Sequence, residues 1–284
     1  MTASLPARGP GAAAPPRLAP RTLLFVPGSQ PERFGKATAT AADLVIVDLE
    51  DAVAEEHKAT ARDALAQWLA AGGSAAVRVN GTQSVYYQQD VTALTGLPGL
   101  RAVVVPMAED PAALAALHQH LGPDVEIVAL IETALGVVRA FELASTSGVI
   151  RLAFGHLDFA ADIDSSIEDE AMLMARSALV VASRAAGLAG PVAGVTTDLD
   201  DPAVCGADAV RARRLGFAGK LCIHPSQVDA VNAAFSPGED EIAWAHRIIG
   251  CSTAGGAVRV DGHMVDAPVI LKARSVLARA QERA

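Results

Sequence analysis

Short runs of β-branched and other apolar residues alternate along the chain with Ala- and Leu-rich stretches whose apolar residues recur at helical spacing. Continuous Val, Ile and Leu runs are typical of buried parallel strands, and parallel neighbours need crossover connections of a dozen or more residues. The strand-like runs are Thr22–Pro27, Leu44–Leu49, Ala75–Val79, Ala102–Pro106, Glu126–Ile131, Ile150–Phe154, Pro191–Val195 and Leu221–His224. This alternation predicts an α/β protein with a parallel sheet.

Helical patterns fill the stretches between these strands. They cover Glu55–Ala71, Asp110–Leu121, Leu135–Ala144, Glu168–Ala186 and Pro202–Leu215. Eight β/α units in a chain of 284 residues favour a (β/α)8 TIM barrel. An open doubly wound sheet is the alternative, because a strand count from one sequence is easily off by one.

The pattern divides the chain into three parts. Residues 1–20 are crowded with Pro, Gly and Ala, which predicts a flexible leader, with an Arg-containing transit peptide as the alternative. Residues 21–228 form the expected barrel domain. Residues 229–284 form a C-terminal helical extension, with helices over Glu239–Ile249 and Pro268–Arg283 around a turn-rich segment, and we expect it to pack on a neighbouring subunit.

Composition narrows the possible functions. The chain is 51% hydrophobic with a net charge of −9, so it can bury a large core and is poorly suited to a nucleic-acid partner. No apolar stretch approaches the roughly 20 residues of a membrane span. The three cysteines have no metal-ligand spacing, which favours a cytoplasmic location. P-loop, GxGxxG, HExxH and GxSxG motifs are absent from the sequence, so kinase, dinucleotide and zinc-protease functions lose their main support.

Two carboxylates follow neighbouring strands at the end where a TIM barrel places its active site. Glu132 follows the run EIVALI, and Asp158 follows the next strand after a short loop. Adjacent parallel strands lie about 5 Å apart, so the two carboxylates can hold one hard cation such as Mg²⁺. The remaining positions would be open to water and substrate oxygens. The structural alternative is that both residues cap the helices that follow.

Arg78 lies in the otherwise apolar run AAVRVN. A buried arginine needs an anionic partner, either a carboxylate of the DLED segment 48–51 or a substrate carboxylate or enolate oxygen. Strand alternation places Asp48 and Glu50 on one face. We therefore expect Glu50 to point into the barrel mouth and Asp51 to cap the next helix. His224, before a proline, is interpreted as a structural residue at a strand end rather than as a base.

Seven segments together resemble the citrate lyase β-subunit-like family, within the wider aldolase, malyl-CoA lyase and citramalyl-CoA lyase superfamily. They are RTLLFVPGS (21–29), VDLEDAV (47–53), VRVN (77–80), ALIET (129–133), FGHLDFAAD (154–162), LGFAGKLCIHPSQV (215–228) and MVDAPVILKARSVL (264–277). The likeness extends in the same order from Arg21 to the C-terminus, and only the leader lies outside it.

The resemblance implies a Mg²⁺-dependent carbon–carbon lyase with a TIM-barrel fold, a homotrimer or a dimer of trimers. Its substrates would be acyl-CoA or acyl-carrier thioesters of hydroxy acids, such as malyl-, citramalyl- or citryl-CoA. A β subunit that works only inside a multiprotein citrate lyase is one alternative. A class II aldolase acting on a free oxo-acid adduct is another.

The resemblance also assigns roles to residues. Glu132 and Asp158 would be the metal ligands, with Glu132 also facing the substrate. Arg78 would bind the substrate carboxylate or enolate, and Phe25 and Lys36 would line the substrate pocket.

A further acid would come from another subunit. Asp266 of the MVD segment would enter the active site of a neighbouring subunit as acid or base, and Glu50 is the additional catalytic candidate at the mouth. Because CoA is an anion, we expect a local basic patch of Arg21, Arg33 and Lys36.

Two positions depart from the family pattern. Met107 follows Pro106 where relatives commonly have lysine, and Asp164 replaces a frequent glycine. The first change removes a charge near the mouth, which leaves the substrate open. The second could alter the loop beyond Asp158 without affecting the ligand itself.

Overall fold

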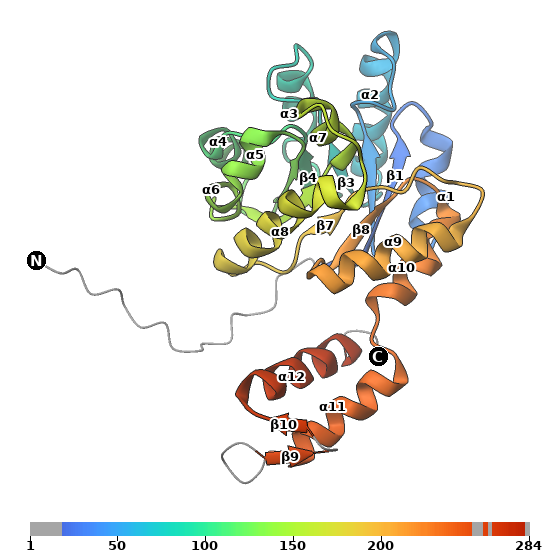
Figure 1. Cartoon of the computed structure of the whole chain (residues 1–284). Coiled ribbons are helices and arrows are strands. Elements are labelled where there is room, and N and C mark those ends of the chain that lie inside the picture. Colours follow the sequence, from blue (N-terminus) through green and yellow to red (C-terminus); the bar gives the residue numbers. More distant parts are fainter. Residues whose placement is uncertain (1–18, 252–257, 261–262, 282–284) are drawn as a thin grey trace, which may run out of the picture.

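The computed structural model describes residues 19–251, 258–260 and 263–281. Within this part of the chain, strands β1 to β8 form a closed barrel in which neighbours run parallel, with helices around the outside (Figure 1). The strands are β1 (Thr22–Pro27), β2 (Leu44–Asp48), β3 (Ala75–Arg78), β4 (Leu100–Val105), β5 (Glu126–Ile131), β6 (Val149–Phe154), β7 (Val192–Ala193) and β8 (Gly219–Cys222). The TIM-barrel prediction is confirmed, and the open sheet is wrong.

Helices cover the outside of the barrel. They are α1 (Phe34–Thr38), α2 (Lys58–Ala70), α3 (Tyr87–Leu94), α4 (Pro111–Leu121), α5 (Ala134–Val138), α6 (Ala140–Ala144), α7 (His156–Asp162), α8 (Asp169–Ala185), α9 (Pro202–Leu215) and α10 (Val228–Phe235). Short 3-10 turns occupy Pro31–Arg33, Glu55–His57 and Pro225–Gln227. The short helices α1, α3 and α7 escaped prediction because five to eight residues show too little periodicity.

The helix boundaries follow from local sequence chemistry. Helices α4 and α9 each begin with an aspartate whose carboxylate accepts a hydrogen bond from the second helical residue, followed by proline at the first helical position. Both features stabilise a helix N-terminus. Gly216, with φ 105°, ends α9 in the left-handed conformation that glycine adopts without steric cost.

A buried polar network ties the ends of β2 and β3 to the outer helices. Asp90 of α3 accepts hydrogen bonds from Arg62 Nε at 2.8 Å and from the Asn80 backbone N–H at 2.9 Å. The Asn80 side chain also donates to the Leu49 carbonyl at 3.0 Å. Since Asn80 follows β3 closely and Leu49 follows β2, this network fixes the two strand ends from which the candidate site is built.

The chain leaves the barrel at the end opposite to the mouth. Helix α10 packs with its buried side chains in the outer core, and Ser236 Oγ accepts a hydrogen bond from Arg21 Nη1 at 2.9 Å, just before β1. The outer layer therefore continues to Ser236, beyond the expected boundary at residue 228. Arg21 lies at this same end, ion-paired with Asp43 at 2.9 Å. Arg33 and Lys36 follow β1 at the other end of the barrel, so the expectation that the three residues form one local basic patch was wrong.

The C-terminal extension has its own small core. It consists of α11 (Glu239–Cys251), β9 (Val258–Val260), β10 (His263–Val265) and α12 (Ala267–Gln281), with β9 and β10 antiparallel. The buried side chains of this unit are Ala245, Ile248, Val265, Ala273 and Val276. The extension lies below the barrel in Figure 1, and the strand β9 falls inside the segment that was expected to be rich in turns.

The leader lies almost wholly outside the described residues, so its prediction stays untested. Among the helices that the structure describes, none has the length and apolar content needed to cross a bilayer.

The network around Asp90 generates a stability prediction. Asp90→Leu should lower the free energy of unfolding by about 3–5 kcal/mol, because it leaves the Arg62 guanidinium buried without its charge partner. Adding Arg62→Met to this variant should recover much of the loss. Urea unfolding followed by circular dichroism measures both effects. A single variant as stable as the parent would show that the network does not support the fold.

Candidate active site

The side chain of Arg78 is the centre of the candidate site. It extends from the C-terminal end of β3 and is 11% exposed. Asp48, at the end of β2, accepts from its Nε at 2.7 Å and from its Nη2 at 2.6 Å. This two-point geometry is the strongest form of the arginine–carboxylate interaction. The buried arginine therefore has the neighbouring-strand partner that its apolar sequence context predicted.

The turn after β2 brings two further acids to the same guanidinium. Nη1 of Arg78 lies 3.1 Å from Asp51 Oδ2 and 3.2 Å from Glu50 Oε2. Asp48 itself accepts from the backbone N–H groups of Glu50 and Ala52. Glu50 reaches Arg78, as expected. Regular strand alternation ends at Asp48, and in the turn that follows Asp51 also contacts Arg78, so the prediction that Asp51 caps the next helix was wrong. The next 3-10 turn begins after Ala54.

The environment of Arg78 keeps it charged. Burial alone would lower its pKa, but the hydrogen-bonded Asp48 and the charges of Glu50 and Asp51 raise the pKa above its ordinary value. The centroid of the half-buried Phe25 ring, in β1, lies 4.9 Å from the Arg78 guanidinium carbon, within range of a cation–π contact. Phe25 thus lies in the candidate site, as the resemblance implied.

Glu132 is a buried acid of the site, at 4% exposure. It directly follows β5, and its Oε2 accepts a hydrogen bond from the Met107 backbone N–H at 2.8 Å. A Cβ at position 155 would lie 2.4 Å from Glu132 Cγ and Oε1, so only glycine leaves room for this carboxylate. Thr133, rather than Glu132, caps the helix that follows, and the helix-capping alternative for Glu132 is therefore excluded.

Asp158 lies in the first turn of α7 and is exposed. Gly155 precedes that helix at the cap position, so Asp158 is not its N-cap. Its charge acts on Glu132, whose pKa is raised to about 8: burial is the main cause, the Met107 hydrogen bond opposes the rise, and the charge of Asp158 contributes to it. The charge of Asp158 therefore reaches the buried Glu132 carboxyl, and the assignment of both residues as cation ligands stays a prediction.

Glu50 behaves like Glu132. Its pKa is raised to about 8, mainly by burial; the charge of Arg78 opposes the rise, and the charges of Asp51 and Glu132 contribute to it. Two buried carboxyls that repel each other favour either a proton or a bound cation. Among the described residues, no three or more His, Cys, Asp or Glu side chains gather around a possible metal.

The two positions that depart from the family pattern both have left-handed backbone. Met107 has φ 47° and Asp164 has φ 52°, a conformation that non-glycine residues adopt rarely. At Met107 this backbone turns the N–H onto Glu132, which the sequence could not reveal. Asp164, at the position where the family resemblance led us to expect glycine, has the left-handed backbone conformation that glycine adopts most easily.

A cavity of about 280 Å³ lies beside the site, and sequence reasoning missed it. Its walls are the loop 81–84, the segment Met107–Asp110 and residues of α4. Since Met107 also contacts Glu132, the cavity adjoins the acidic centre and offers space for an extended ligand.

Other predicted residues lie further from the centre. Lys36 is exposed on α1 and Arg33 is exposed just before it, in the segment that follows β1 at the mouth end. Asp266 is half-buried before α12, where its Oδ1 lies 3.5 Å from the Val269 backbone N–H. His224 accepts from the Ser226 backbone N–H as the cap of a 3-10 turn, as expected of a structural residue.

Comparison with known proteins agrees with this geometry. Residues 21–225 match the HpcH/HpaI aldolase/citrate lyase family. The chain belongs to this family. The matched region contains the barrel strands together with Arg78, Glu132 and Asp158.

Individual relatives are similar over almost the whole chain. A citrate lyase subunit beta-like protein of Deinococcus radiodurans is 37% identical, over 93% of this chain and 98% of its own length. A (3S)-malyl-CoA thioesterase of Cereibacter sphaeroides is 34% identical, over 92% and 94%. The crystal structure of Mycobacterium tuberculosis CitE with magnesium, acetoacetate and coenzyme A has a TM-score of 0.82 at 34% identity, and covers 93% of this chain and 99% of that chain.

Membership in this lyase family confirms the resemblance read from the sequence, and the protein is an enzyme of the carbon–carbon lyase type. The family match ends at residue 225, whereas the similarity to CitE continues into the C-terminal extension.

The raised pKa values of Glu50 and Glu132 predict how stability depends on pH. Both carboxyls have an ordinary pKa of 4.5 and a folded pKa of about 8. The folded chain therefore holds protons that the unfolded chain has lost, and without divalent cations its stability should fall as the pH rises from about 5 to about 8. Urea unfolding at a series of pH values in chelator measures this dependence.

The Glu132→Gln variant is the control, since it removes one of the two titrating groups and should flatten the decline. Stability that rises with pH over this range, or an identical decline in the variant, would show that the buried carboxyls do not titrate as inferred.

Proposed function

We propose that this chain is a Mg²⁺-dependent lyase that cleaves a β-hydroxyacyl-CoA thioester, such as malyl-, citramalyl- or citryl-CoA, into an oxo acid and an acyl-CoA. The reverse reaction is a Claisen-type condensation. The observation that carries the proposal is the pair Glu132 and Asp158 beside the buried, charged Arg78. The similarity to CitE, whose structure contains magnesium, acetoacetate and coenzyme A, supports the same assignment.

The donor set suits Mg²⁺. Glu132 and Asp158 are hard oxygen donors that repel each other when both are ionised, and Mg²⁺ in enzymes is commonly held by one or two carboxylates with water and substrate oxygens. When bound, the ion polarises the oxygens of the oxo-acid half and lowers the pKa of the hydroxyl. Gly155 serves this arrangement by leaving space for the Glu132 carboxylate.

Arg78 would stabilise negative charge during cleavage. Loss of the hydroxyl proton lets the carbon–carbon bond break, its electron pair passes to the thioester as an enolate, and the enolate carbon then takes up a proton. Nη2 of Arg78 uses one N–H for Asp48, and its second N–H can donate to a substrate carboxylate or enolate oxygen. Such preorganised donors are worth a few kcal/mol, roughly 2.7–4, in a dry site.

Glu50 is the candidate acid–base group within the chain. Its pKa of about 8 lies close to neutral pH, where a group can both accept and release a proton effectively. Its carboxyl group contacts the Arg78 guanidinium, as those of Asp48 and Asp51 do, and it therefore lies at the centre of the proposed reaction.

Phe25 and the basic residues of α1 would complete the substrate pocket. Phe25 packs on Arg78, while Lys36 and Arg33 are exposed after β1 and could pair with the CoA phosphates. The 280 Å³ cavity beside Met107 offers space for part of the thioester.

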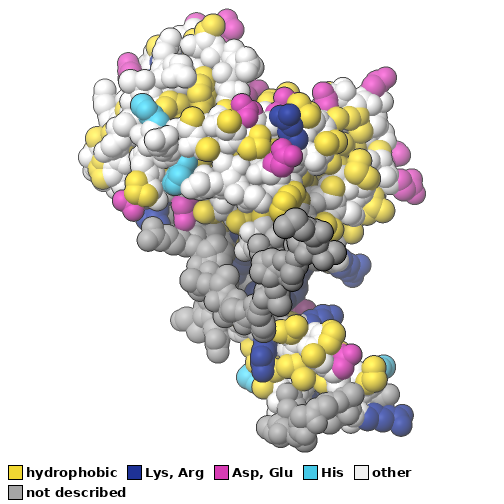
Figure 2. Space-filling model, turned by 90° about the vertical axis from the view of Figure 1, so that its left-hand side faces the viewer, with side chains coloured by type: hydrophobic (Ala, Val, Ile, Leu, Met, Phe, Trp, Pro, Cys, Tyr) yellow, Lys and Arg dark blue, Asp and Glu magenta, His cyan; other side chains and the backbone are white. Residues whose placement is uncertain are grey.

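Asp266 would act in a neighbouring subunit. The extension begins at the end of the barrel opposite to the mouth, and β10 and α12, between which Asp266 lies, are drawn below the barrel in Figure 1. Apolar side chains exposed on α5, α6 and α8, among them Val138 (82%), Met174 (66%) and Val181 (68%), lie on helices of the barrel side seen in Figure 2. Apolar surface of this kind is common at subunit interfaces, which supports an oligomer; the homotrimer or dimer of trimers is what the family resemblance implies.

Three alternative activities differ from this one in their substrates or products. The chain could act as the β subunit of a citrate lyase complex on an acyl-carrier thioester, or as a class II aldolase on a free oxo-acid adduct. The relative named (3S)-malyl-CoA thioesterase adds thioester hydrolysis, which releases free CoA and malate rather than an oxo acid and an acyl-CoA.

A panel of thioesters tests the proposal. The protein with Mg²⁺ should release an oxo acid and an acyl-CoA from at least one of malyl-, citramalyl- and citryl-CoA, as measured by mass spectrometry of both products. Glu132→Gln should lower kcat/KM at least about a hundredfold, because it removes a charged cation ligand. Asp63→Asn, on the exposed surface of α2, is the matched acid-to-amide control and should keep full activity.

Each alternative has its own result. Free CoA with malate indicates hydrolysis, cleavage that survives removal of the CoA moiety indicates the aldolase, and turnover restricted to a carrier thioester indicates the complex subunit. Full activity of Glu132→Gln would refute the assignment of the metal ligand.

Mixed oligomers test the role of Asp266. Arg78→Ala and Asp266→Ala subunits should each be inactive alone, and mixing them after partial denaturation should restore activity, since some sites then combine an intact Arg78 with an intact Asp266. With random assembly the recovered activity should be an appreciable fraction of the parent's. Absence of rescue in hybrids whose assembly is verified by native mass spectrometry would mean that Asp266 does not act between subunits.

A further inference from the structure

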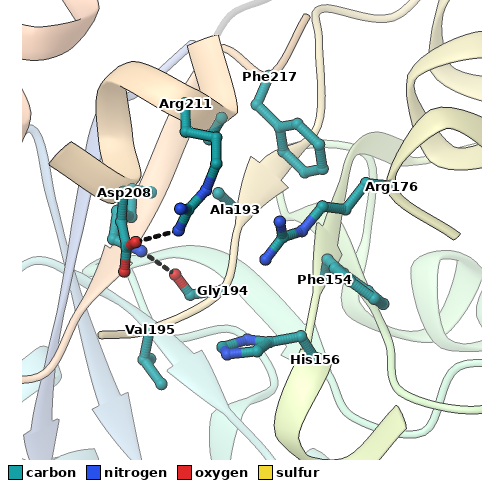
Figure 3. A pocket seen from close by; sticks show the side chains of 11 residues that line it. Phe154, His156, Arg176, Ala193, Gly194, Val195, Asp208, Arg211 and Phe217 are labelled. Atoms are coloured by element: carbon teal, nitrogen blue, oxygen red, sulfur yellow. Dashed lines mark hydrogen bonds and ion pairs between the residues drawn. The ribbon is translucent and has the colours of Figure 1, made fainter. Parts of the chain in front are cut away.

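A second pocket lies outside the barrel wall, between β7, β8 and the helices α8 and α9. Its lining residues are Phe154, His156, Arg176, Ala193, Gly194, Val195, Asp208, Arg211, Ala212, Phe217 and Lys220. Figure 3 shows the guanidinium groups of Arg176 and Arg211 and the imidazole of His156 directed toward the same space. The proposed lyase reaction uses none of these side chains.

Lys220 forms the base of this pocket and is 3% exposed. Its neighbour Leu221 belongs to the barrel interior, so Lys220 points outward toward α9. Its Nζ donates to the Gly194 carbonyl at 2.6 Å, which uses one of three N–H donors. Among the described residues it has no ion pair, and burial lowers its pKa. A buried ammonium with a single carbonyl partner is costly and would be stabilised by an anion.

The charges around the pocket leave a positive excess. Asp169 bridges the two arginines, at 2.7 Å from Arg176 Nη1 and 2.9 Å from Arg211 Nη1. Asp208 pairs with Arg211 and accepts from the Thr196 hydroxyl. Two carboxylates therefore face three cations, which leaves an excess of one positive charge. The charge of Asp208 acts on Lys220, but Asp208 is ion-paired with Arg211.

The pocket volume restricts what can bind. At about 30 Å³, the cavity admits an ion of a few atoms and excludes a nucleotide or a coenzyme. The two guanidinium groups favour a planar or tetrahedral oxyanion, because arginine binds such groups through paired N–H donors. Their shared contact with the Asp169 carboxylate shows that both are already directed at oxygen acceptors.

We propose that this pocket is a binding site for a small oxyanion, bound by Lys220, Arg176 and Arg211. The site lies on the outer face of the barrel wall, and it depends neither on the cation site nor on the reaction proposed above. A bound oxyanion would supply the missing counter-charge to Lys220 and link β8 to α8 and α9.

Inorganic phosphate is the probe. Isothermal titration of the full-length, metal-free protein with sodium phosphate at constant ionic strength should show saturable binding of one ion per chain. Arg176→Gln and Arg211→Gln should each weaken the binding by about tenfold or more, because each removes a charged donor. Asp208→Asn should strengthen it by a similar factor, since it removes the acid that lines the pocket. Lys220 is left unchanged, because its replacement would leave the Gly194 carbonyl buried without a donor.

Arg214→Gln is the matched control. Arg214 is exposed on the same helix α9 and does not line the pocket, so its loss should leave the phosphate affinity unchanged.

Each contrary result overturns the proposal. Absence of saturable phosphate binding, equal affinity in the parent and in the Arg176→Gln and Arg211→Gln variants, or an equal loss in Arg214→Gln would show that the pocket is not the site. Binding of bromide without binding of phosphate would refute the assignment to an oxyanion. None of these measurements depends on enzymatic activity, so they succeed or fail independently of the proposed lyase reaction.

Discussion

The interaction of Arg78 with Asp48 is the constraint on which the candidate site depends. An arginine inside the mouth of an apolar barrel is tolerated only with a well-placed counter-charge, and Asp48 provides it from the adjacent strand at 2.6–2.7 Å. The same carboxylate accepts backbone N–H groups of the following turn, so that turn carries Glu50 and Asp51 back onto the guanidinium. One ion pair thus determines both the charge of the site and the path of the chain around it.

Charge is unevenly compensated in two places of the barrel. At the mouth, acids outnumber the single arginine, and the pKa values of Glu50 and Glu132 rise to about 8, mainly through burial and further through the charges of nearby acids. Behind the wall of β7 and β8, cations outnumber acids, and Lys220 lacks a counter-ion among the described residues. The overall charge of −9 conceals both, because a buried site responds to its nearest charges rather than to the total.

The barrel and the acids at its mouth could be predicted because they depend on local pattern. Apolar runs identify strands, and in a barrel the residues that follow those runs meet at one end, which is how Arg78, Glu132 and Asp158 were found. What could not be predicted depends on contacts between distant residues or on backbone conformation. The Met107 N–H on Glu132 requires a left-handed residue that no sequence rule would place there, and Asp51 reaches Arg78 through a turn where strand alternation no longer holds.

The separate core of the C-terminal extension has a thermodynamic consequence. Its buried side chains form a cluster distinct from those of the barrel, and an ion pair between Arg213 and Glu241 at 2.7 Å joins the two units. Units that share few buried contacts lose structure as separate cooperative blocks. A single melting temperature then has no simple meaning for an isolated chain, because its two units unfold separately. It has a simple meaning only if assembly with other chains makes the two units unfold together.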